Sequence, residues 1–461
     1  MVDTQKIAAF KAELRGAVIE PSDRNYDEVR SLYNGMIDKK PRVIARVVDV
    51  ADVIKAVAFG RETGLPIAIR GGGHNGPGLS SVDNGLVIDF SVMKGIHVDA
   101  RNSTVRVEPG CTQGDVDHAS HAFGLAVPAG IVSTTGIAGL TLGGGTGYLT
   151  RQYGLTIDNL LEADVVLADG RFVTASEKEN ADLFWALRGG GGNFGVVTSF
   201  LYRAHPVKNV YGGPIFWEMK DAGKVMRVYR DMLAKLPVKL GAFVGLKTMP
   251  AVPPFPEAHW NKKIVAIIFG YDGTQAEGEA AIKPLLDQLP QPIMNGAGYM
   301  PYTTLQTLFD PLMPKGMQWY WKGDFVKELS DEAIDTHIQF ASRSPSPLCL
   351  THLYPIDGAV HKVKPGDTAW ATRDARFNMV IAAIDTSPSK AKDLKTWGRA
   401  YWEAVHPFNM GGAYINFMSD DENDDRIQAT YGSNYKRLTE IKKKYDPKNL
   451  FRVNQNIRPA L

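Results

Sequence analysis

The chain has 461 residues, more than one typical core holds, and this length predicts two or three domains. Apolar residues make up 44% and charged residues 22%, which excludes wholesale disorder. The 52 basic and 50 acidic residues leave a net charge of +2, which argues against nucleic acid or an anionic membrane as a main partner.

Cysteine content and the N-terminus indicate the compartment. Cys111 and Cys349 are too few for a disulfide framework or an all-cysteine zinc site, and we expect no metal. The N-terminus lacks the apolar core of a signal peptide, and no stretch approaches the ~20 apolar residues of a membrane span. We therefore expect a soluble, cytoplasmic protein, either a monomer or a homodimer.

Strand-like and helix-like segments alternate through the first two hundred residues. Short apolar or alternating runs predict strands at 42–46, 65–70, 86–90, 104–108, 161–167 and 196–200. Amphipathic runs predict helices at 50–61 and 182–187. Most of the glycine clusters lie in this half, which indicates backbone wrapped closely around a ligand.

The character of the sequence changes near Pro206, where glycine clusters stop and Trp, Phe and Pro become more frequent. A strand is predicted at 263–270 and a helix at 276–288, followed near the end by a helix at 435–445 and an extended segment at 450–457. We interpret residues 1–205 as one domain, 206–418 as a second and 419–461 as a C-terminal segment.

Two segments, 71–76 and 190–195, match the dinucleotide pattern Gly-x-Gly-x-x-Gly. That pattern binds a pyrophosphate only where a strand precedes it and a helix follows, because the phosphates sit on the N-terminus of the helix. Pro77 and another strand follow the first match, and the second lies between a helix and a strand. A nicotinamide-binding Rossmann domain is therefore not expected.

A third glycine cluster spans 136–147 and follows the hydroxyl residues 133–135. Three clusters within about a hundred residues predict a long, phosphate-bearing ligand held by bare backbone. His74 is the one reactive side chain in the first loop, and its imidazole can act as a nucleophile near neutral pH. An ordinary loop histidine is the alternative.

These motifs resemble the FAD-linked oxidases of the vanillyl-alcohol oxidase superfamily, and within it the berberine-bridge-enzyme-like branch. The matching segments are 70–75, 139–148, 153–160, 182–197 and 445–457, so the resemblance spans nearly the whole chain. It implies an α+β fold. An FAD-binding domain of two α/β subdomains would be joined to a substrate domain with a large antiparallel sheet backed by helices. The isoalloxazine ring would lie between them, and the C-terminal segment would return to the FAD-binding domain.

The resemblance also implies the residues that bind FAD. His74 stands where the family's histidine bonds the 8α carbon of the flavin. Many members have a second link from a cysteine, but Val132 stands at that position, so we expect one covalent link, through His74. The implied FAD-binding residues are Arg70, Gly71, Gly72, Gly73, His74, Asn75, Gly76, Ser133, Thr134, Thr135, Gly136, Gly139, Gly144, Gly147, Asp158, Asn159, Gly195, Val197, Tyr414, Asn416, Asn454 and Asn456.

Catalytic candidates come from a family pattern, Tyr-x-Asn-Tyr, whose last tyrosine is the base in some members. Residues 414–417 read Tyr-Ile-Asn-Phe, and Phe417 cannot take a proton. The candidates are then Tyr414, with Asn416 beside it, and His352, whose ordinary pKa is near ~6.5. We favour His352, on a strand expected to face the flavin. A half-buried histidine without a catalytic role is an equal alternative.

Two further features concern the substrate. The run 319–321 (Trp-Tyr-Trp) would give an aromatic wall, although a strand points alternate members of such a run to opposite faces, where they pack in a core. Arg373 resembles a family position near the substrate cleft, or forms a surface ion pair.

The resemblance implies an oxidase. It would move a hydride from an alcohol or amine carbon of a small aromatic, secondary-metabolite or sugar-like substrate to flavin N5, and O2 would reoxidise the flavin to give H2O2. A dehydrogenase with another acceptor, a flavin oxygenase, and a flavin-binding protein without turnover are the alternatives.

Overall fold

The computed structural model describes residues 4–419 and 421–461. The chain begins with a small sheet in the order β1-β2-β4-β3, in which β2, β4 and β3 are parallel and β1 is antiparallel to β2. Its strands are β1 (Ala17–Ile19), β2 (Val43–Arg46), β3 (Ile67–Arg70) and β4 (Leu86–Asp89). Its helices are α1 (Thr4–Glu13), α2 (Tyr26–Arg30) and α3 (Val50–Thr63). The residues 71–85 connect β3 to β4 without a helix.

Helix α3 shows how local sequence sets these elements. The Asp49 carboxylate caps its first turn by accepting a hydrogen bond from the Asp52 amide, and Gly64 ends it with φ of +70°. Its apolar side packs against β4 and also against β8 and β10 of a second sheet. The helix therefore lies between the two sheets of the N-terminal half.

The second sheet is antiparallel, in the order β5-β6-β10-β8-β9. Its strands are β5 (Ile96–Asp99), β6 (Thr104–Val107), β8 (Leu160–Val166), β9 (Phe172–Ser176) and β10 (Val196–Arg203). The helices around it are α4 (Gln113–His121), α5 (Ile137–Gly143), α6 (Thr150–Tyr153) and α7 (Ala181–Leu187). Two short strands, β7 (Leu125–Ala126) and β11 (His205–Pro206), pair with each other.

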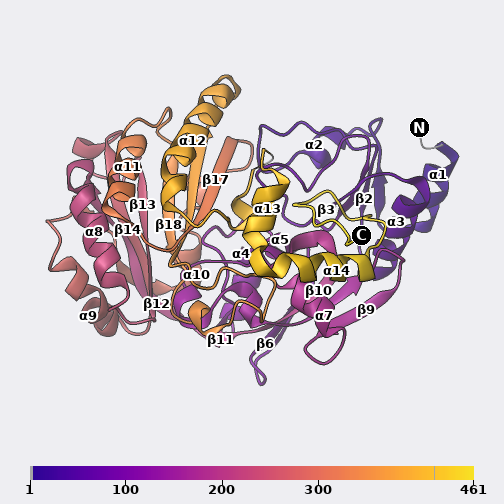
Figure 1. The fold of residues 1–461 in the computed structure, drawn as a ribbon, viewed down its shortest axis with the longest axis horizontal. Coiled ribbons are helices and arrows are strands. Elements are labelled where there is room, and N and C mark those ends of the chain that lie inside the picture. Colours follow the sequence, from indigo (N-terminus) through magenta and orange to yellow (C-terminus); the bar gives the residue numbers. More distant parts are fainter. Residues whose placement is uncertain (1–3, 420) are drawn as a thin grey trace.

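The end of the chain packs on this half. Helix α14 (Tyr435–Tyr445) packs against α7, and helix α13 (Asp424–Tyr431), which precedes it, also reaches the large sheet through an ion pair between Arg426 and Asp324 (Figure 1). Buried Lys442 donates to the Asp446 carboxylate at 2.7 Å and to the carbonyls of Asn193 and Phe451. The extended tail after α14 is therefore tied to the glycine segment 190–195.

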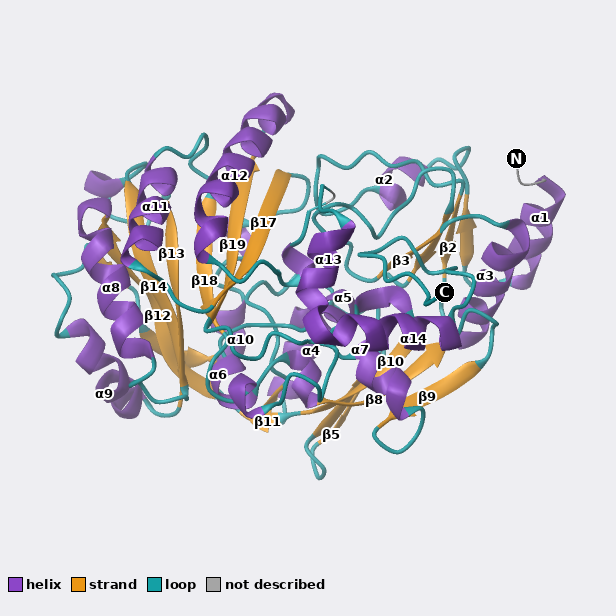
Figure 2. Ribbon diagram, viewed as in Figure 1, coloured by secondary structure: helices purple, strands orange, loops and turns teal. Residues whose placement is uncertain are grey.

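The large sheet is fully antiparallel, in the order β15-β12-β14-β13-β18-β19-β17, with β16 also paired to β12. Its strands are β12 (Asn209–Glu218), β13 (Leu240–Thr248), β14 (Lys263–Asp272), β15 (Met294–Asn295), β16 (Gly298–Pro301), β17 (Gln318–Val326), β18 (Leu350–Pro355) and β19 (Phe377–Asp385). The helices α8 (Ala222–Leu233), α9 (Gln275–Leu286), α11 (Asp331–Ser342) and α12 (Ala391–Val405) pack against it (Figure 2). A short helix, α10 (Tyr302–Gln306), packs against α4.

Alternation along the strands divides the large sheet into two apolar faces. Val244, Leu353 and Ile381 belong to the core under the helices. Phe243 and Val380 belong to the core on the opposite face, which also contains Tyr148 and Ile131 from the N-terminal half. The second face therefore packs against the N-terminal half of the chain.

The α+β fold class, with its large antiparallel sheet backed by helices, is confirmed. The helix predicted at 435–445 is α14, and the predicted strands and helices of the first half are all present. No helix was predicted in the third glycine cluster, but Ile137–Gly143 form α5, because Ile137 and Leu140 bury their side chains against the second sheet. Cys111 and Cys349 are both free and buried.

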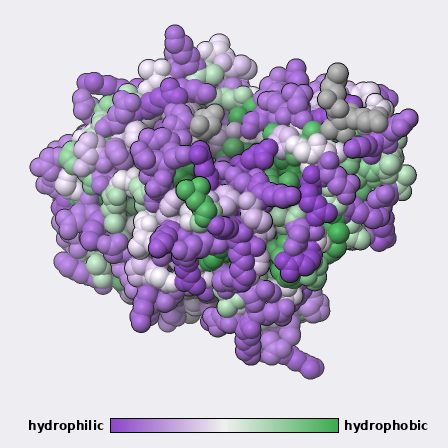
Figure 3. Space-filling view, turned by 45° about the vertical axis from the view of Figure 1, so that its right-hand side comes forward, coloured by the Kyte–Doolittle hydropathy of each residue, from purple (hydrophilic) through white to green (hydrophobic). Residues whose placement is uncertain are grey.

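The surface in Figure 3 is mainly hydrophilic, and the hydrophobic side chains visible on that face are scattered or recessed. Within the described ranges, no helix has the length and apolar character to cross a bilayer. The same residues contain no group of His, Cys, Asp and Glu that could hold a metal ion.

Candidate active site

A cavity of about 310 Å³ lies where the large sheet meets the N-terminal half, within the size range of small-molecule sites. Its walls come from the loop after β3, from 130–146, from 191–197, from three strands of the large sheet, and from the segments 414–417 and 451–455. Among the described residues, no Asp, Glu, Lys or Arg side chain lines it. The ligand is therefore held by backbone, aromatic, amide and hydroxyl groups rather than by ion pairs.

Two of the glycine clusters touch each other at the backbone. A Cβ atom on Gly72 would lie 2.5 Å from the Cα of Gly136, so neither position has room for a side chain. Gly73 has φ of +68°, in the left-handed region that favours glycine. The loop between β3 and β4 can therefore pass directly over α5, and this contact fixes the place of His74.

His74 is half-buried beside the cavity. Its ring stacks on Tyr33 with 3.8 Å between the centroids, and Nε2 lies 3.1 Å from the Thr134 hydroxyl oxygen. Burial lowers the pKa of His74 to about 3, so the imidazole is neutral at pH 7. With Nε2 engaged by Thr134, Nδ1 is the nitrogen with no hydrogen-bond partner in the described part of the chain.

Bare backbone leaves space for a cofactor on this side. A Cβ atom on Gly139 or on Gly192 would meet no atom within 4 Å, and both residues line the cavity. The Asn454 side chain also lines it, with a buried Oδ1 that lacks a partner in the described residues. An elongated ligand such as FAD fits this wall, because it fills space that side chains would otherwise take and supplies a donor to the unpaired oxygen.

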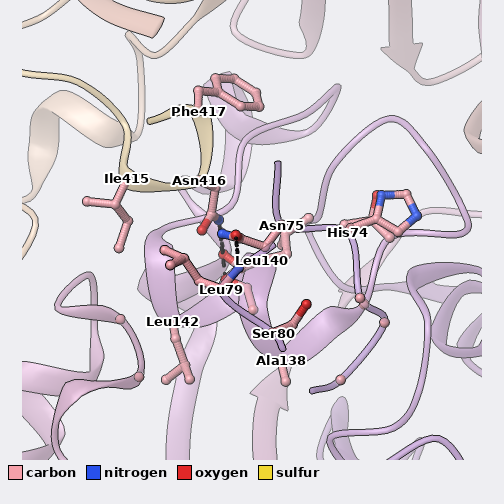
Figure 4. A pocket seen from close by; sticks show the side chains of 18 of the residues that line it. His74, Asn75, Leu79, Ser80, Ala138, Leu140, Leu142, Ile415, Asn416 and Phe417 are labelled. Atoms are coloured by element: carbon pink, nitrogen blue, oxygen red, sulfur yellow. Dashed lines mark hydrogen bonds between the residues drawn. The ribbon is translucent and has the colours of Figure 1, made fainter. Parts of the chain in front are cut away.

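Tyr414 and Asn416, from the C-terminal part of the chain, form hydrogen bonds to the third glycine cluster. The Tyr414 hydroxyl accepts from the Gly145 amide at 2.9 Å and from Asn416 Nδ2 at 2.7 Å. Asn416 Nδ2 also lies 3.2 Å from the Leu140 carbonyl, and Figure 4 shows it reaching α5 on the side of the cavity opposite His74. Burial raises the pKa of Tyr414 to about 12, so this hydroxyl keeps its proton at neutral pH.

The large sheet supplies the facing wall, which consists mainly of apolar and aromatic side chains. These are Trp319, Trp321, Leu350, His352, Tyr354, Val380 and Ala382, together with Met313 from the segment before β17. The His352 Nδ1 lies 2.6 Å from the Tyr354 hydroxyl, while its buried Nε2 has no partner in the described chain. Burial, and secondly the charge of Lys247, lower the pKa of His352 to about 3.

The structure brings many of the predicted residues together and leaves others outside. Those that line the cavity are Gly71, Gly72, Gly73, His74, Asn75, Thr135, Gly136, Gly139, Gly195, Val197, His352, Tyr414, Asn416 and Asn454. Those that do not are Arg70, Gly76, Ser133, Thr134, Gly144, Gly147, Asp158, Asn159 and Asn456.

Several of the outlying residues have structural partners instead. Asp158 forms a two-point ion pair with Arg373, with both contacts at 2.8 Å. Of the two alternatives for Arg373, the structure therefore has the ion pair, which is buried rather than on the surface. Arg70 pairs with buried Asp89 at 2.9 Å. Asn159 donates to backbone carbonyls of its own turn. These side chains shape the site by supporting its loops.

The side chains of residues 319–321 in β17 point alternately to opposite faces of the sheet, as predicted. Trp319 and Trp321 line the cavity, whereas Tyr320 points to the other face and bonds to Asp421. Sequence reasoning missed Tyr33 and Asn34. Asn34 donates to the carbonyls of Gly76 and Trp319 and so ties the His74 loop to β17. Neither residue belongs to a motif, and no signal in the sequence marks them.

Comparison with known proteins gives a consistent picture. Residues 41–176 match the FAD binding domain family, and residues 413–458 match the family described as berberine and berberine like. An FAD-linked oxidoreductase of Dictyostelium discoideum is 33% identical over 99% of this chain and 97% of its own length. The (R)-6-hydroxynicotine oxidase of Paenarthrobacter nicotinovorans is 38% identical over 98% of both chains. The structure of a chitooligosaccharide oxidase has a TM-score of 0.86 and 25% identity, covering 99% of this chain and 100% of the other.

Proposed function

Because the chain belongs to the berberine-bridge-enzyme-like branch of the FAD-linked oxidoreductases, we propose that it is an oxidase of a small organic alcohol or amine. The substrate carbon loses a hydride and the attached oxygen or nitrogen loses a proton, while O2 is reduced to H2O2. The observation that carries this proposal is a single cavity with bare backbone on one side and an aromatic sheet with one imidazole on the other.

The same geometry supports separate roles in cofactor binding and substrate binding for different segments of the chain. Residues 1–205 and 419–461 would hold the cofactor, and residues 206–418 would form the substrate side. FAD, when bound, accepts the hydride and passes two electrons to O2. The glycine clusters, Asn75 and Asn454 would contact it through backbone and amide groups.

We propose that His74 holds FAD by one covalent bond. The neutral imidazole has an unpaired Nδ1 and a ring fixed by Tyr33 and Thr134, which suits it as a nucleophile toward the 8α carbon of the cofactor. The new C–N bond would replace a C–H bond of that carbon, with two protons released and two electrons passing to O2. Val132 also lines the cavity, but its side chain offers no nucleophile for a second bond.

Among the catalytic candidates, His352 lies on the wall formed by the large sheet, which we call the substrate wall and which also contains Tyr354, whereas Tyr414 is engaged with the glycine cluster. We therefore assign His352 to substrate contact and Tyr414 and Asn416 to positioning of the cofactor loop. The hydroxyl of Tyr414, with its raised pKa, does not serve as the base.

Acid denaturation of the purified protein tests the cofactor assignment. Yellow colour should stay with the precipitate, and the intact mass should exceed that of the polypeptide by one FAD. Colour in the supernatant would refute the covalent bond, and absence of flavin from both fractions would refute the proposed function.

A panel of alcohols, amines and sugars with a peroxide readout tests the reaction. At least one compound should bleach the flavin under nitrogen, and air should restore the colour rapidly with release of H2O2. If the reduced flavin returns slowly in air but quickly with a quinone, the enzyme is a dehydrogenase rather than an oxidase.

A further inference from the structure

We propose that residues 33–35, the bridging segment, hold the His74 imidazole in place from the edge of the large sheet, and that attachment of FAD to His74 depends on this support. Tyr33 and Asn34 are its positioning residues. The inference rests on the proposed covalent bond and deepens it, because it makes the substrate half of the chain a requirement for attaching the cofactor to the other half.

The bridging segment pairs with the edge of the large sheet. Among the described strands, β17 has one neighbour, β19, so its other side is an open edge. The Gly35 amide donates to the Met317 carbonyl at 2.7 Å, just before β17. The Gly316 amide donates to the Tyr33 carbonyl at 2.9 Å. A segment of the N-terminal half therefore covers backbone groups at this edge that would otherwise lack partners.

Asn34 extends this pairing with its side chain. Its Nδ2 donates to the Gly76 carbonyl at 2.7 Å and to the Trp319 carbonyl at 2.9 Å. Its Oδ1 accepts from the Trp319 amide at 3.1 Å and from the Met36 amide at 2.9 Å. A side-chain amide has two donor hydrogens and two acceptor lone pairs, so this buried residue has every position filled. Asn34 therefore sets the distance between β17 and the loop that carries His74.

The His74 loop, residues 73–76, contacts the bridging segment and β17 directly. The Tyr33 amide donates to the Gly73 carbonyl at 3.2 Å. A Cβ atom on Gly76 would lie 1.7 Å from Nε1 of Trp321, so the loop backbone packs against a ring of β17. The position of this loop therefore depends on β17 as well as on α5.

Tyr33 extends this dependence to the imidazole. Its ring stacks on His74 with 3.8 Å between the centroids and 21° between the planes. The same ring lies 5.3 Å from the ring of Trp319. Its hydroxyl donates to the Met313 carbonyl at 2.8 Å. The side chain that fixes the plane of His74 is therefore itself held by residues 313–319 of the substrate half.

A fixed imidazole matters for forming the bond more than for binding FAD. The bond replaces a C–H bond of the 8α carbon, with two protons released and two electrons passing to O2. A nitrogen of His74 must meet that carbon in the correct geometry, and a misplacement of about 1 Å can cost about a hundredfold in rate. Binding without the bond depends on open space along the glycine clusters, such as that at Gly139 and Gly192. Loss of the support should therefore separate binding from attachment.

Two variants of Tyr33 test the stacking. Tyr33→Leu removes the ring, and Tyr33→Phe keeps it. In freshly purified, FAD-saturated Tyr33→Leu, we expect the flavin fraction that precipitates with acid to be at least about twofold lower than in wild type and to rise with time in air. Tyr33→Phe should match wild type. A wild-type fraction in Tyr33→Leu, or an equal loss in Tyr33→Phe, would overturn the role of the ring.

Gly35→Ala tests the dependence on β17 without a change in the cavity lining. A Cβ atom on Gly35 would lie 2.2 Å from the Gly316 carbonyl oxygen, so the bridging segment must move away from β17. Gly35 does not line the cavity, and we expect the same loss of covalent flavin as in Tyr33→Leu. Gly366→Ala, in open space on an exposed loop, is the matched control and should behave as wild type. Full attachment in Gly35→Ala would overturn the inference.

A second control separates positioning from general stability. The Asn434 side chain donates to carbonyls of the segment 365–369, and neither Asn434 nor that segment lines the cavity. Asn434→Leu should lower the melting temperature but leave the covalent fraction unchanged. An equal loss of covalent flavin in Asn434→Leu would attribute the effect to destabilisation and overturn the inference.

The wild-type protein separates the two possible failures. If its flavin precipitates with acid, and that of Tyr33→Leu and Gly35→Ala does so to the same extent, the covalent bond stands and only the role of the bridging segment fails. If acid releases the wild-type flavin, or if no flavin is present, the proposed bond fails and the inference that rests on it fails as well.

Discussion

The two walls of the cavity differ in which atoms they present. The glycine clusters form the wall where we propose that FAD binds, the cofactor wall, and the large sheet forms the substrate wall. On the side where we propose that FAD binds, the cavity presents backbone, because Gly72 and Gly136 touch and Gly139 and Gly192 leave open space where a Cβ atom would stand. On the substrate side it meets Trp319, Trp321, His352 and other side chains. A wall of backbone atoms is the same in every chain that has glycine at these positions. A wall of side chains changes its ligand preference with each substitution.

The largest expected effect is therefore a side chain placed on the backbone wall. Gly139→Leu puts a leucine where no protein atom lies within 4 Å, so the chain should fold normally but contain no FAD. Flavin absorbance per protein and the melting temperature check both parts. Gly366→Leu is the matched control, because Gly366 also has open space around its Cβ position but lies on an exposed loop. Full flavin content in Gly139→Leu would show that the cofactor lies elsewhere.

Removal of the proposed covalent bond should leave the backbone wall intact. In His74→Ala, acid precipitation should release all the flavin into the supernatant, although the native protein stays yellow because the glycine clusters still hold FAD. His97→Ala, a change at an exposed histidine, should behave as wild type. Flavin that precipitates with His74→Ala would assign the bond to another residue.

A cysteine at position 132 should restore a covalent bond to the flavin when His74 is removed. Val132 lines the cavity at the position where the family pattern has a cysteine. We expect Val132→Cys combined with His74→Ala to bring flavin back to the acid precipitate through a thioether. If the double variant releases its flavin as His74→Ala does, the Val132 side chain does not reach the cofactor.

The same contrast explains what the sequence could predict. The cofactor wall could be predicted from the sequence because the glycine clusters and His74 form a recognisable pattern. The strands next to them could also be predicted, because each one is a short apolar run. The substrate wall depends on which face of each antiparallel strand meets the other half of the chain, and on register such as His352 beside Val380, which no local signal sets. Asp158 and Asn159, which the family motif predicts at FAD, do not line the cavity and hold loops through their hydrogen bonds. A motif includes residues of this kind as well as those that line the cavity.

A substitution at Tyr414 tests whether this residue positions the cofactor loop or takes part in the chemistry. Tyr414→Phe removes the acceptor of the Gly145 amide, so we expect a loss of about 1–3 kcal/mol in the free energy of unfolding. The kcat should fall by less than about tenfold, whereas loss of a general base costs about a hundredfold to ten-thousandfold. Tyr229→Phe is the control for stability, since its buried hydroxyl donates to the Ala242 carbonyl away from the cavity. A kcat loss in the range of a lost base would return Tyr414 to the chemistry.

The smallest expected effect is the response of kcat/KM to pH between 5 and 8 with a neutral substrate. His352 loses its proton only as pH rises through about 3, and Tyr414 keeps its proton until about 12, so neither changes charge in this window. The profile should therefore have no inflection from either residue, and His352→Gln should have a profile of the same shape. An inflection near ~6.5 in the wild type that vanishes in His352→Gln would mean that His352 titrates as a free histidine does. Such a result would make it a base after all, and the substrate wall would then take part in proton transfer as well as in recognition.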